Sequence, residues 1–197
     1  MARNMQPILK RCRTLGISPS VMGIDKSSNR NPKPNKRKQS EYGRQLTEKQ
    51  KVKFIYGMLE KQFARYYEMA TKMPGITGEN LLQILESRLD NVVFRLGLAN
   101  TRRESRQFVN HGHVLVNGKR VDIPSYRVKV GDVITIKEKL LSTDRMKEVI
   151  EANSSRAVPK WLDMDKNTAT GKVIAMAERE DIDFEVEEHL IVELYSR

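Results

Sequence analysis

The stretch that decides the fold is residues 101–121, TRRESRQFVNHGHVLVNGKRV. Its first half carries the start and stop signals of a short helix. Thr101 stands three residues before Glu104, which is the spacing of a capping box, and Gly112 is the residue type that commonly ends a helix. We therefore expect a helix that begins after Thr101 and ends before Gly112.

The second half of the same stretch has the pattern of a β-hairpin. Val114–Val116 and Lys119–Val121 flank Asn117-Gly118, a dipeptide that tolerates the positive φ angles of a tight hairpin turn. The alternation of apolar and polar residues resumes over 128–136 and predicts a further strand. Two short helices and a small twisted sheet within about sixty residues make a compact α+β unit.

Two longer helical patterns precede this unit. A capping-box spacing begins at Thr47, and apolar residues then recur at helical intervals as far as Ala70, which predicts one long amphipathic helix. Helical spacing returns from Leu81 to Leu96. Residues 140–152 also have a helical pattern.

The two ends of the chain differ in character. Residues 1–45 contain four prolines and the basic run 33–38 without a sustained helix or strand period, so we expect an extended basic arm that orders on a partner. The segment 184–195 mixes acidic and apolar residues, and we expect it to dock onto the rest of the protein.

Charge is segregated along the 197 residues. Lys and Arg total 36 against 25 Asp and Glu, a net charge of +11. Residues 1–65 hold 16 basic and 4 acidic residues, 66–150 hold 14 and 10, and 151–197 hold 6 and 11. Solubility alone would not explain this segregation, whereas contact between one part of the chain and a polyanion would. No apolar run approaches the ~18 residues of a membrane span, so we expect a cytoplasmic protein with no membrane partner.

Three arginines fall within one turn of the predicted helix: Arg102, Arg103 and Arg106. Positive side chains beside the positive end of a helix dipole favour an anion between them, and a phosphate is the natural choice. We expect replacement of all three by Gln to weaken RNA binding and to leave the unfolding temperature nearly unchanged.

Metal and catalytic signals are weak. His111 and His113 lack a third ligand nearby, and Cys12 is the only cysteine. Asp163 begins a calcium-loop pattern, but Thr168 stands where that loop requires glycine. We expect no metal, no cofactor, no small-molecule substrate and no enzymatic activity.

The segment RLDNVVFRLGLANTRRESRQFVNHGHVLVNGKRVDIPSYRVKVGD at 88–132 resembles the RNA-binding module named after ribosomal protein S-four. Four further stretches are similar to the bacterial small-subunit S-four family itself: SEYG at 40–43, EKQKVKFIYGMLEKQFARYY at 48–67, TGENLL at 77–82 and EEHLIVELYSR at 187–197. Several family members hold zinc through clustered N-terminal cysteines, and this chain departs from that pattern because it has only Cys12.

The resemblance implies an α+β fold in which the module, two helices packed on a short twisted sheet, is inserted in a helical domain. The expected parts are a basic extended arm at 1–45, the first part of the helical domain at 46–87, the module at 88–150 and a return to the helical domain at 151–197. It also implies a structural constituent of the small ribosomal subunit that binds 16S rRNA early in assembly. The implied neighbours are the ribosomal proteins S-three and S-five and the mRNA where it enters the subunit, with a contribution to translational accuracy.

The residues that the resemblance and the charge pattern together assign to RNA lie in the helical domain and in the module. They are Arg44, Lys49, Lys51, Lys53, Arg65, Arg88, Arg102, Arg103, Arg106, His113, Asn117, Lys119 and Arg120.

Two alternatives use the same basic surfaces. The module also occurs in pseudouridine synthases and tyrosyl-tRNA synthetases, but an RNA-modifying enzyme would need a catalytic domain of perhaps two hundred further residues. A free RNA chaperone, or a repressor of the protein's own mRNA, needs no such domain, and repression is compatible with rRNA binding.

Overall fold

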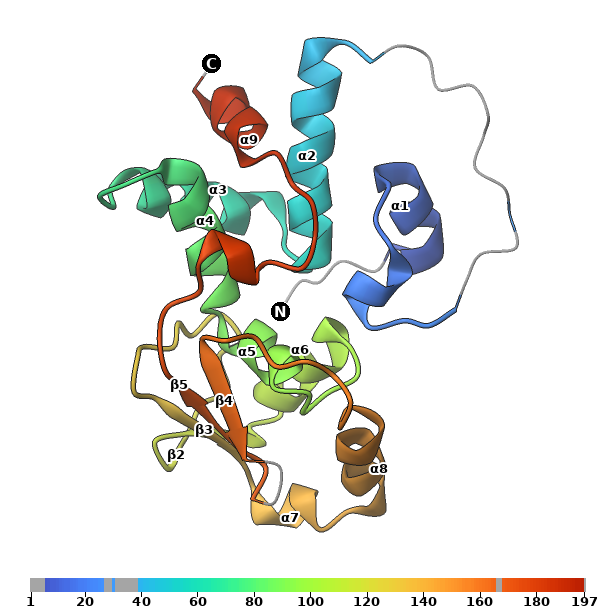
Figure 1. The fold of residues 1–197 in the computed structure, drawn as a ribbon, viewed down its shortest axis with the longest axis vertical. Coiled ribbons are helices and arrows are strands. Elements are labelled where there is room, and N and C mark those ends of the chain that lie inside the picture. Colours follow the sequence, from blue (N-terminus) through green and yellow to red (C-terminus); the bar gives the residue numbers. More distant parts are fainter. Residues whose placement is uncertain (1–5, 27–29, 31–38, 166–167, 197) are drawn as a thin grey trace. The chain divides into compact units, whose positions relative to one another are not determined.

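The structure, a computed structural model, describes residues 6–26, 30, 39–165 and 168–196 (Figure 1). The basic run at 33–38 lies outside the described residues. The chain divides into two compact units, with one boundary inside helix α4. The helical unit comprises the residues up to Leu82 and those from Asp183 on, and the module unit comprises Gln83–Ile182.

The helical unit is built from the following elements: α1 Ile8–Leu15, the 3-10 helix η1 Pro19–Met22, α2 Glu41–Ile55, α3 Glu60–Thr71, the first part of α4 Thr77–Glu86, and α9 Glu188–Tyr195. Helix α2 begins after Ser40, whose Oγ accepts a hydrogen bond from the Gly43 amide at 3.2 Å. The capping box expected at Thr47 is wrong, because Thr47 lies inside α2 and its hydroxyl donates to the Gly43 carbonyl.

The long helix expected from Thr47 to Ala70 is two helices, α2 and α3. The break lies at Tyr56–Leu59, where Gly57 has a φ of 63° and the chain leaves the helical path. Burial continues across the break, since Ile55, Tyr56, Met58 and Phe63 are all buried. Periodicity therefore indicated most of the buried face correctly, but it missed the interruption and was wrong for Leu59, which is 42% exposed.

The described part of the expected arm is not wholly extended. Residues Ile8–Leu15 form α1, in which Cys12 and Leu15 are buried. Burial raises the pKa of the Cys12 thiol. The prediction that residues 1–45 lack a helix is therefore wrong for this segment, where apolar and basic residues alternate at helical spacing over only two turns.

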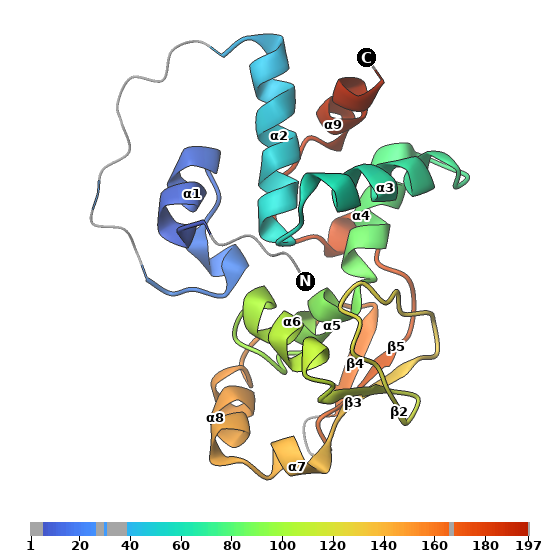
Figure 2. The same ribbon diagram turned by 180° about the vertical axis from the view of Figure 1, so that it is seen from behind.

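Helix α9 packs along α2, although more than 130 positions separate them in the sequence, and the two lie side by side in both views (Figure 1 and Figure 2). Gln45 donates to Glu193 at 3.0 Å, and the hydroxyl of Tyr67 donates to the Val192 carbonyl at 3.4 Å. The rings of Tyr67 and Tyr195 stack with centroids 4.5 Å apart. The expected docking of the C-terminal segment is confirmed.

The module unit holds the remaining elements: the end of α4, α5 Leu89–Arg95, α6 Arg102–Asn110, β1 Val114–Val116, β2 Lys119–Arg120, β3 Val133–Ile136, α7 Glu138–Leu141, α8 Asp144–Ala152, β4 Leu162–Asp165, β5 Thr170–Val173 and the 3-10 helix η2 Arg179–Asp181. The strands form one antiparallel sheet in the order β2-β1-β3-β5-β4. The α+β class is confirmed.

The hairpin has the expected register. Leu115 pairs with Arg120 and Val116 with Lys119, and the two turn residues Asn117 and Gly118 have φ angles of 50° and 74°. The predicted strand over 128–136 is shorter: β3 spans only Val133–Ile136, and Ile134–Ile136 pair with β1.

Strands β4 and β5 extend the sheet beyond its expected edge. Thr135 of β3 pairs with Thr170, so residues expected to return to the helical unit from 151 instead complete the module sheet, and the return begins at Asp183. At Gly171 a Cβ would overlap the Leu96 methyl groups, so the missing side chain lets the sheet lie directly against the end of α5. The apolar face of the sheet and helices α5 and α6 enclose a core that includes Val93, Val109 and Trp161.

Candidate nucleic-acid interface

Helix α6 begins after Thr101 and ends before Gly112, the two residues from which its bounds were predicted. Thr101 Oγ1 accepts from the Glu104 amide at 3.2 Å, as the capping-box spacing requires. The reciprocal bond comes from the amide of Asn100 rather than from that of Thr101, at 2.9 Å from Glu104 Oε2. Gly112 ends the helix with a φ of 67°. The first turn is therefore fixed in orientation.

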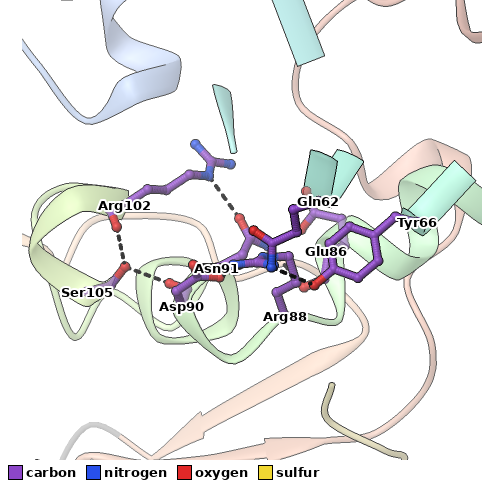
Figure 3. A network of polar contacts seen from close by, with 8 residues as sticks. All are labelled: Gln62, Tyr66, Glu86, Arg88, Asp90, Asn91, Arg102 and Ser105. Atoms are coloured by element: carbon purple, nitrogen blue, oxygen red, sulfur yellow. Dashed lines mark hydrogen bonds and ion pairs between the residues drawn. The ribbon is translucent and has the colours of Figure 1, made fainter. Parts of the chain in front are cut away.

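The three arginines of α6 have different surroundings. Arg102 is 6% exposed, and its Nε donates to Asn91 Oδ1 at 2.8 Å (Figure 3). Its guanidinium lies 4.3 Å from the centroid of the Phe94 ring. Arg103 is exposed and Arg106 is half-buried. Removal of Arg102 would leave a buried amide oxygen without its donor, so we expect replacement of all three to lower the unfolding temperature.

Arg88 also belongs to the interior. It is fully buried, and its guanidinium donates from Nε and Nη2 to the two oxygens of Asp90 at 3.0 and 2.7 Å. Arg88 precedes α5 and forms an isolated bridge with Arg127, which splits the helix expected from Leu81 to Leu96. Direct contact of Arg88 with a phosphate is therefore a wrong prediction.

A second buried ion pair lies beside it. The carboxylate of Glu86 accepts two hydrogen bonds from Arg95, at 3.1 and 2.8 Å, and one from Asn91 at 2.7 Å. Ser105 of α6 donates to the Asp90 carbonyl at 2.6 Å (Figure 3). Asn91 also accepts a hydrogen bond from Arg102. One connected polar network therefore joins the end of α4, helix α5 and helix α6, and it fixes the first turn of α6.

The hairpin residues divide in the same way. Asn117 is a turn residue: its amide donates to Asp132 Oδ1 at 2.8 Å, and its Oδ1 accepts from the Val133 amide at 2.9 Å. Lys119 and Arg120 are exposed on the outermost strand. The Arg120 guanidinium lies against Gly112, where a Cβ would overlap it, and it is 3.7 Å from Asp122.

His113 stands next to this basic group. Its ring is 5.9 Å from that of His111, and burial, followed by the positive fields of His111, Lys137 and Arg120, lowers the pKa of His113. Lys137 comes directly after β3, and its backbone amide donates to the His113 carbonyl at 2.9 Å. Neither His111 nor Lys137 was among the predicted residues, and no sequence spacing connects Lys137 with the hairpin.

The predicted lysines of α2 are bound to carboxylates. Lys49 and Lys53 lie 2.8 and 2.6 Å from the two oxygens of Glu60, and Lys51 lies 2.7 Å from Glu48. Burial alone would raise the pKa of Glu60, but hydrogen bonds from Lys49, Lys53 and Tyr195 outweigh it and lower the pKa to about 2. Lys49 and Lys53 are therefore arranged around Glu60, and Lys51 is held by Glu48, rather than directed to solvent.

Two further predicted residues of the helical unit are exposed. Arg44 lies 3.6 Å from Glu41 and 3.5 Å from Glu187, in pairs that are half open to solvent. Arg65 is exposed on α3 and forms no ion pair with any described residue. Surface pairs of this kind are weak enough to open for a phosphate.

The module thus presents Arg103, Lys119 and Arg120 on a rigid frame, with His111, His113 and Lys137 beside the hairpin. Such an array can neutralise phosphates at fixed spacings, and it has few side chains suited to read base edges. Across the described ranges, no helix is long and apolar enough to cross a membrane.

Comparison with known proteins gives a consistent result. Residues 3–86 match the family described as Ribosomal protein S4/S9 N-terminal domain, and residues 87–134 match the S4 domain. The chain is 58% identical over 197 residues to Small ribosomal subunit protein uS4 of Agathobacter rectalis, and all of both chains is covered. Proteins of the same name from Lachnospira eligens and Fusobacterium nucleatum are 58% and 50% identical, again with all of both chains covered.

Proposed function

Because the chain belongs to the small ribosomal subunit protein uS4 family, we propose that it is a structural constituent of the small ribosomal subunit that binds 16S rRNA. The observation that carries this proposal is the set of exposed cations, Arg103, Lys119 and Arg120, which are held at fixed positions by the buried network behind α6 and by the hairpin. A phosphate backbone of matching contour is their natural ligand.

Arg44 and Arg65 of the helical unit extend the proposed rRNA contacts, and His113 adds a contact beside the hairpin. The lysines of α2 contribute positive charge near that helix: Lys49, Lys51 and Lys53. For direct contact with a phosphate, each lysine would have to exchange its carboxylate partner for the phosphate. Arg106, half-buried on α6, borders the module surface.

We further propose that the protein binds rRNA early and nucleates assembly, and that it borders the mRNA where it enters the subunit, beside the ribosomal proteins S-three and S-five. A contribution to translational accuracy follows from that position. Repression of its own mRNA would use the same cations and is compatible with this role.

The decisive experiment is filter binding of the full chain to a transcript of its own small-subunit rRNA and to a scrambled transcript of equal length. If about eight phosphates are contacted, the slope of log affinity against log salt concentration is around −5 to −7. We expect preference for the ribosomal transcript and this salt dependence. Equal affinity for both transcripts would refute specific rRNA binding.

Sucrose-gradient fractionation tests the assignment to the subunit. The chain should co-sediment with small subunits. A chain that remains mostly free in the gradient would point instead to an RNA chaperone.

A further inference from the structure

The loop that leads into α6 is held by a residue far away in the sequence. Residues 96–101 connect α5 to α6, so their path sets where the first turn of α6 begins. Arg156, just after α8, donates from Nη1 to the Phe94 and Ala99 carbonyls at 3.4 and 3.3 Å. Its Nη2 donates to the Asn100 carbonyl at 3.4 Å. One guanidinium therefore joins the end of α5 to the residue before the cap of α6.

Asn153 makes a second connection to the same loop. Its Nδ2 donates to Asn100 Oδ1 at 2.8 Å and to the Val149 carbonyl of α8, also at 2.8 Å. Its side chain also packs closely on the loop, because a Cβ added at Gly97 would lie 3.3 Å from the Cβ of Asn153. The loop is therefore attached to the end of α8 by hydrogen bonds and by close packing.

Helix α6 carries this constraint into its first turn. The amide of Asn100 donates to Glu104 Oε2 at 2.9 Å. The other carboxylate oxygen of Glu104 lies 3.0 Å from Nη2 of Arg145 in α8. Arg103 lies between Asn100 and Glu104 in the sequence, and it is exposed. A shift of the loop would therefore displace the backbone of Arg103 as well.

The geometry around the Phe94 ring explains why the residue at 156 is an arginine. The guanidinium of Arg156 lies 4.6 Å from the ring centroid, and that of Arg102 lies 4.3 Å from the same centroid. The two cations repel each other, and the carbonyl dipoles at the end of α5 and in the loop offset that repulsion. A lysine would keep the charge, but it lacks the planar fork that stacks on a ring while donating to several carbonyls.

We propose that Arg156 is a positioning residue for RNA recognition: it fixes the loop before α6, and thereby the place of Arg103, while its own donors are directed to loop carbonyls. The inference rests on the proposed function, because the role that it assigns is in rRNA binding. It also extends the RNA-binding unit, since the S4 domain match ends at residue 134. The segment 153–156 belongs to that unit in function.

A double-mutant cycle tests whether Arg156 acts through Arg103. Arg156→Lys keeps the charge and removes the fork, Arg103→Gln removes the cation that is positioned, and a third chain carries both changes. Filter binding to the protein's own small-subunit rRNA transcript gives the affinity of each full chain. We expect Arg156→Lys to weaken binding about five-fold in the unmodified background and less than about two-fold in the Arg103→Gln background, because coupled residues are not additive.

A control variant separates positioning from a general loss of stability. Ile134→Val trims a fully buried side chain of β3 that makes no hydrogen bond to the loop before α6. Urea unfolding followed by the fluorescence of Trp161 in the module core measures the stability of each chain. We expect Ile134→Val to unfold at lower urea concentration and to bind rRNA like the unmodified chain. A loss of affinity as large as that of Arg156→Lys would show that Arg156 is merely structural.

Hydrogen exchange of the free chain gives a second readout that needs no RNA. Arg156→Lys should speed exchange several-fold in a peptide that covers residues 96–106, while residues 114–120 of the hairpin keep their rates. Unchanged exchange in the first peptide, or equal losses of affinity with and without Arg103, would overturn the inference. Failure of the unmodified chain to prefer its ribosomal transcript would count against the proposed function instead, and the exchange rates would still decide whether Arg156 fixes the loop.

Discussion

The phenolic hydroxyl of Tyr195 donates a hydrogen bond of 2.8 Å to Oε1 of Glu60. Lys49 reaches the same oxygen, and Lys53 reaches the other. One carboxylate therefore connects the three helices α2, α3 and α9. The Tyr195 hydroxyl therefore helps to hold α9 in place.

The variant Tyr195→Phe removes this bond and keeps the ring that stacks on Tyr67. We expect it to destabilise the docked α9 by about 1 kcal/mol, because a partly exposed hydrogen bond to a charged group contributes about that much. Hydrogen exchange read by mass spectrometry should show faster exchange in peptides from α2 and α9. Peptides from β1 and β3 serve as the internal control, and faster exchange there would mean a global rather than a local effect.

Glu60 should make the helical unit sensitive to acid. Its pKa falls from an ordinary value of 4.5 to about 2 in the folded protein, so its contribution is present above the unfolded value and is lost as the pH falls from 4.5 toward 2. The variant Glu60→Gln should be less stable than the unmodified chain near neutral pH, and the difference should shrink in acid. Thermal unfolding followed by far-ultraviolet circular dichroism measures this, and a difference that is independent of pH would contradict it.

Arg102 and Arg103 are neighbours in sequence with opposite roles. Arg102→Gln removes the donor to Asn91 and the stack on Phe94, so we expect a loss of about 2–3 kcal/mol in unfolding free energy. Arg103→Gln should change stability by less than about 0.5 kcal/mol and weaken rRNA binding. Trp161, the single tryptophan, lies in the core of the module unit and reports its unfolding in urea.

Two glycines of the module form a matched pair. Gly112 and Gly118 both have positive φ angles, 67° and 74°, so replacement of either by Ala should cost about 1 kcal/mol of backbone strain. A Cβ at Gly118 meets no atom within 4 Å, whereas one at Gly112 displaces the Arg120 guanidinium. We expect similar losses of stability and a larger loss of rRNA affinity for Gly112→Ala. Equal affinities in filter binding would show that Arg120 does not depend on this contact.

The local signals in the sequence were sufficient for the hairpin and for α6. The turn pair Asn117-Gly118 and the capping residue Thr101 act on backbone atoms one to three positions away. Their effect can therefore be predicted without the tertiary structure. The interruption at Gly57 is local too, because the amides of Gly57 and Met58 donate to the carbonyls of Phe54 and Lys53. The strands β4 and β5 instead depend on partners distant in sequence. Thr170 forms a strand because Thr135 is available to pair with it, and the local pattern did not reveal that.

The candidate RNA residues show the same division. Lys119 and Arg120 are exposed on the second strand of the hairpin, and the sequence predicted that strand. The buried positions of Arg88 and Arg102 depend on Asp90 and Asn91, carboxylate and amide groups that were not considered as partners. Charge type alone therefore does not distinguish a cation that supports the fold from one that faces solvent.

The pairing of α9 with α2 also bears on synthesis. The two halves of the helical unit leave the ribosome at different times, with all of the module unit translated between them. The module can acquire its core while α2 still lacks its packing partner, and the apolar face of α2 stays uncovered during that interval. A nascent chain stalled after residue 182 should therefore attract chaperones at α2, and it should release them once α9 has emerged.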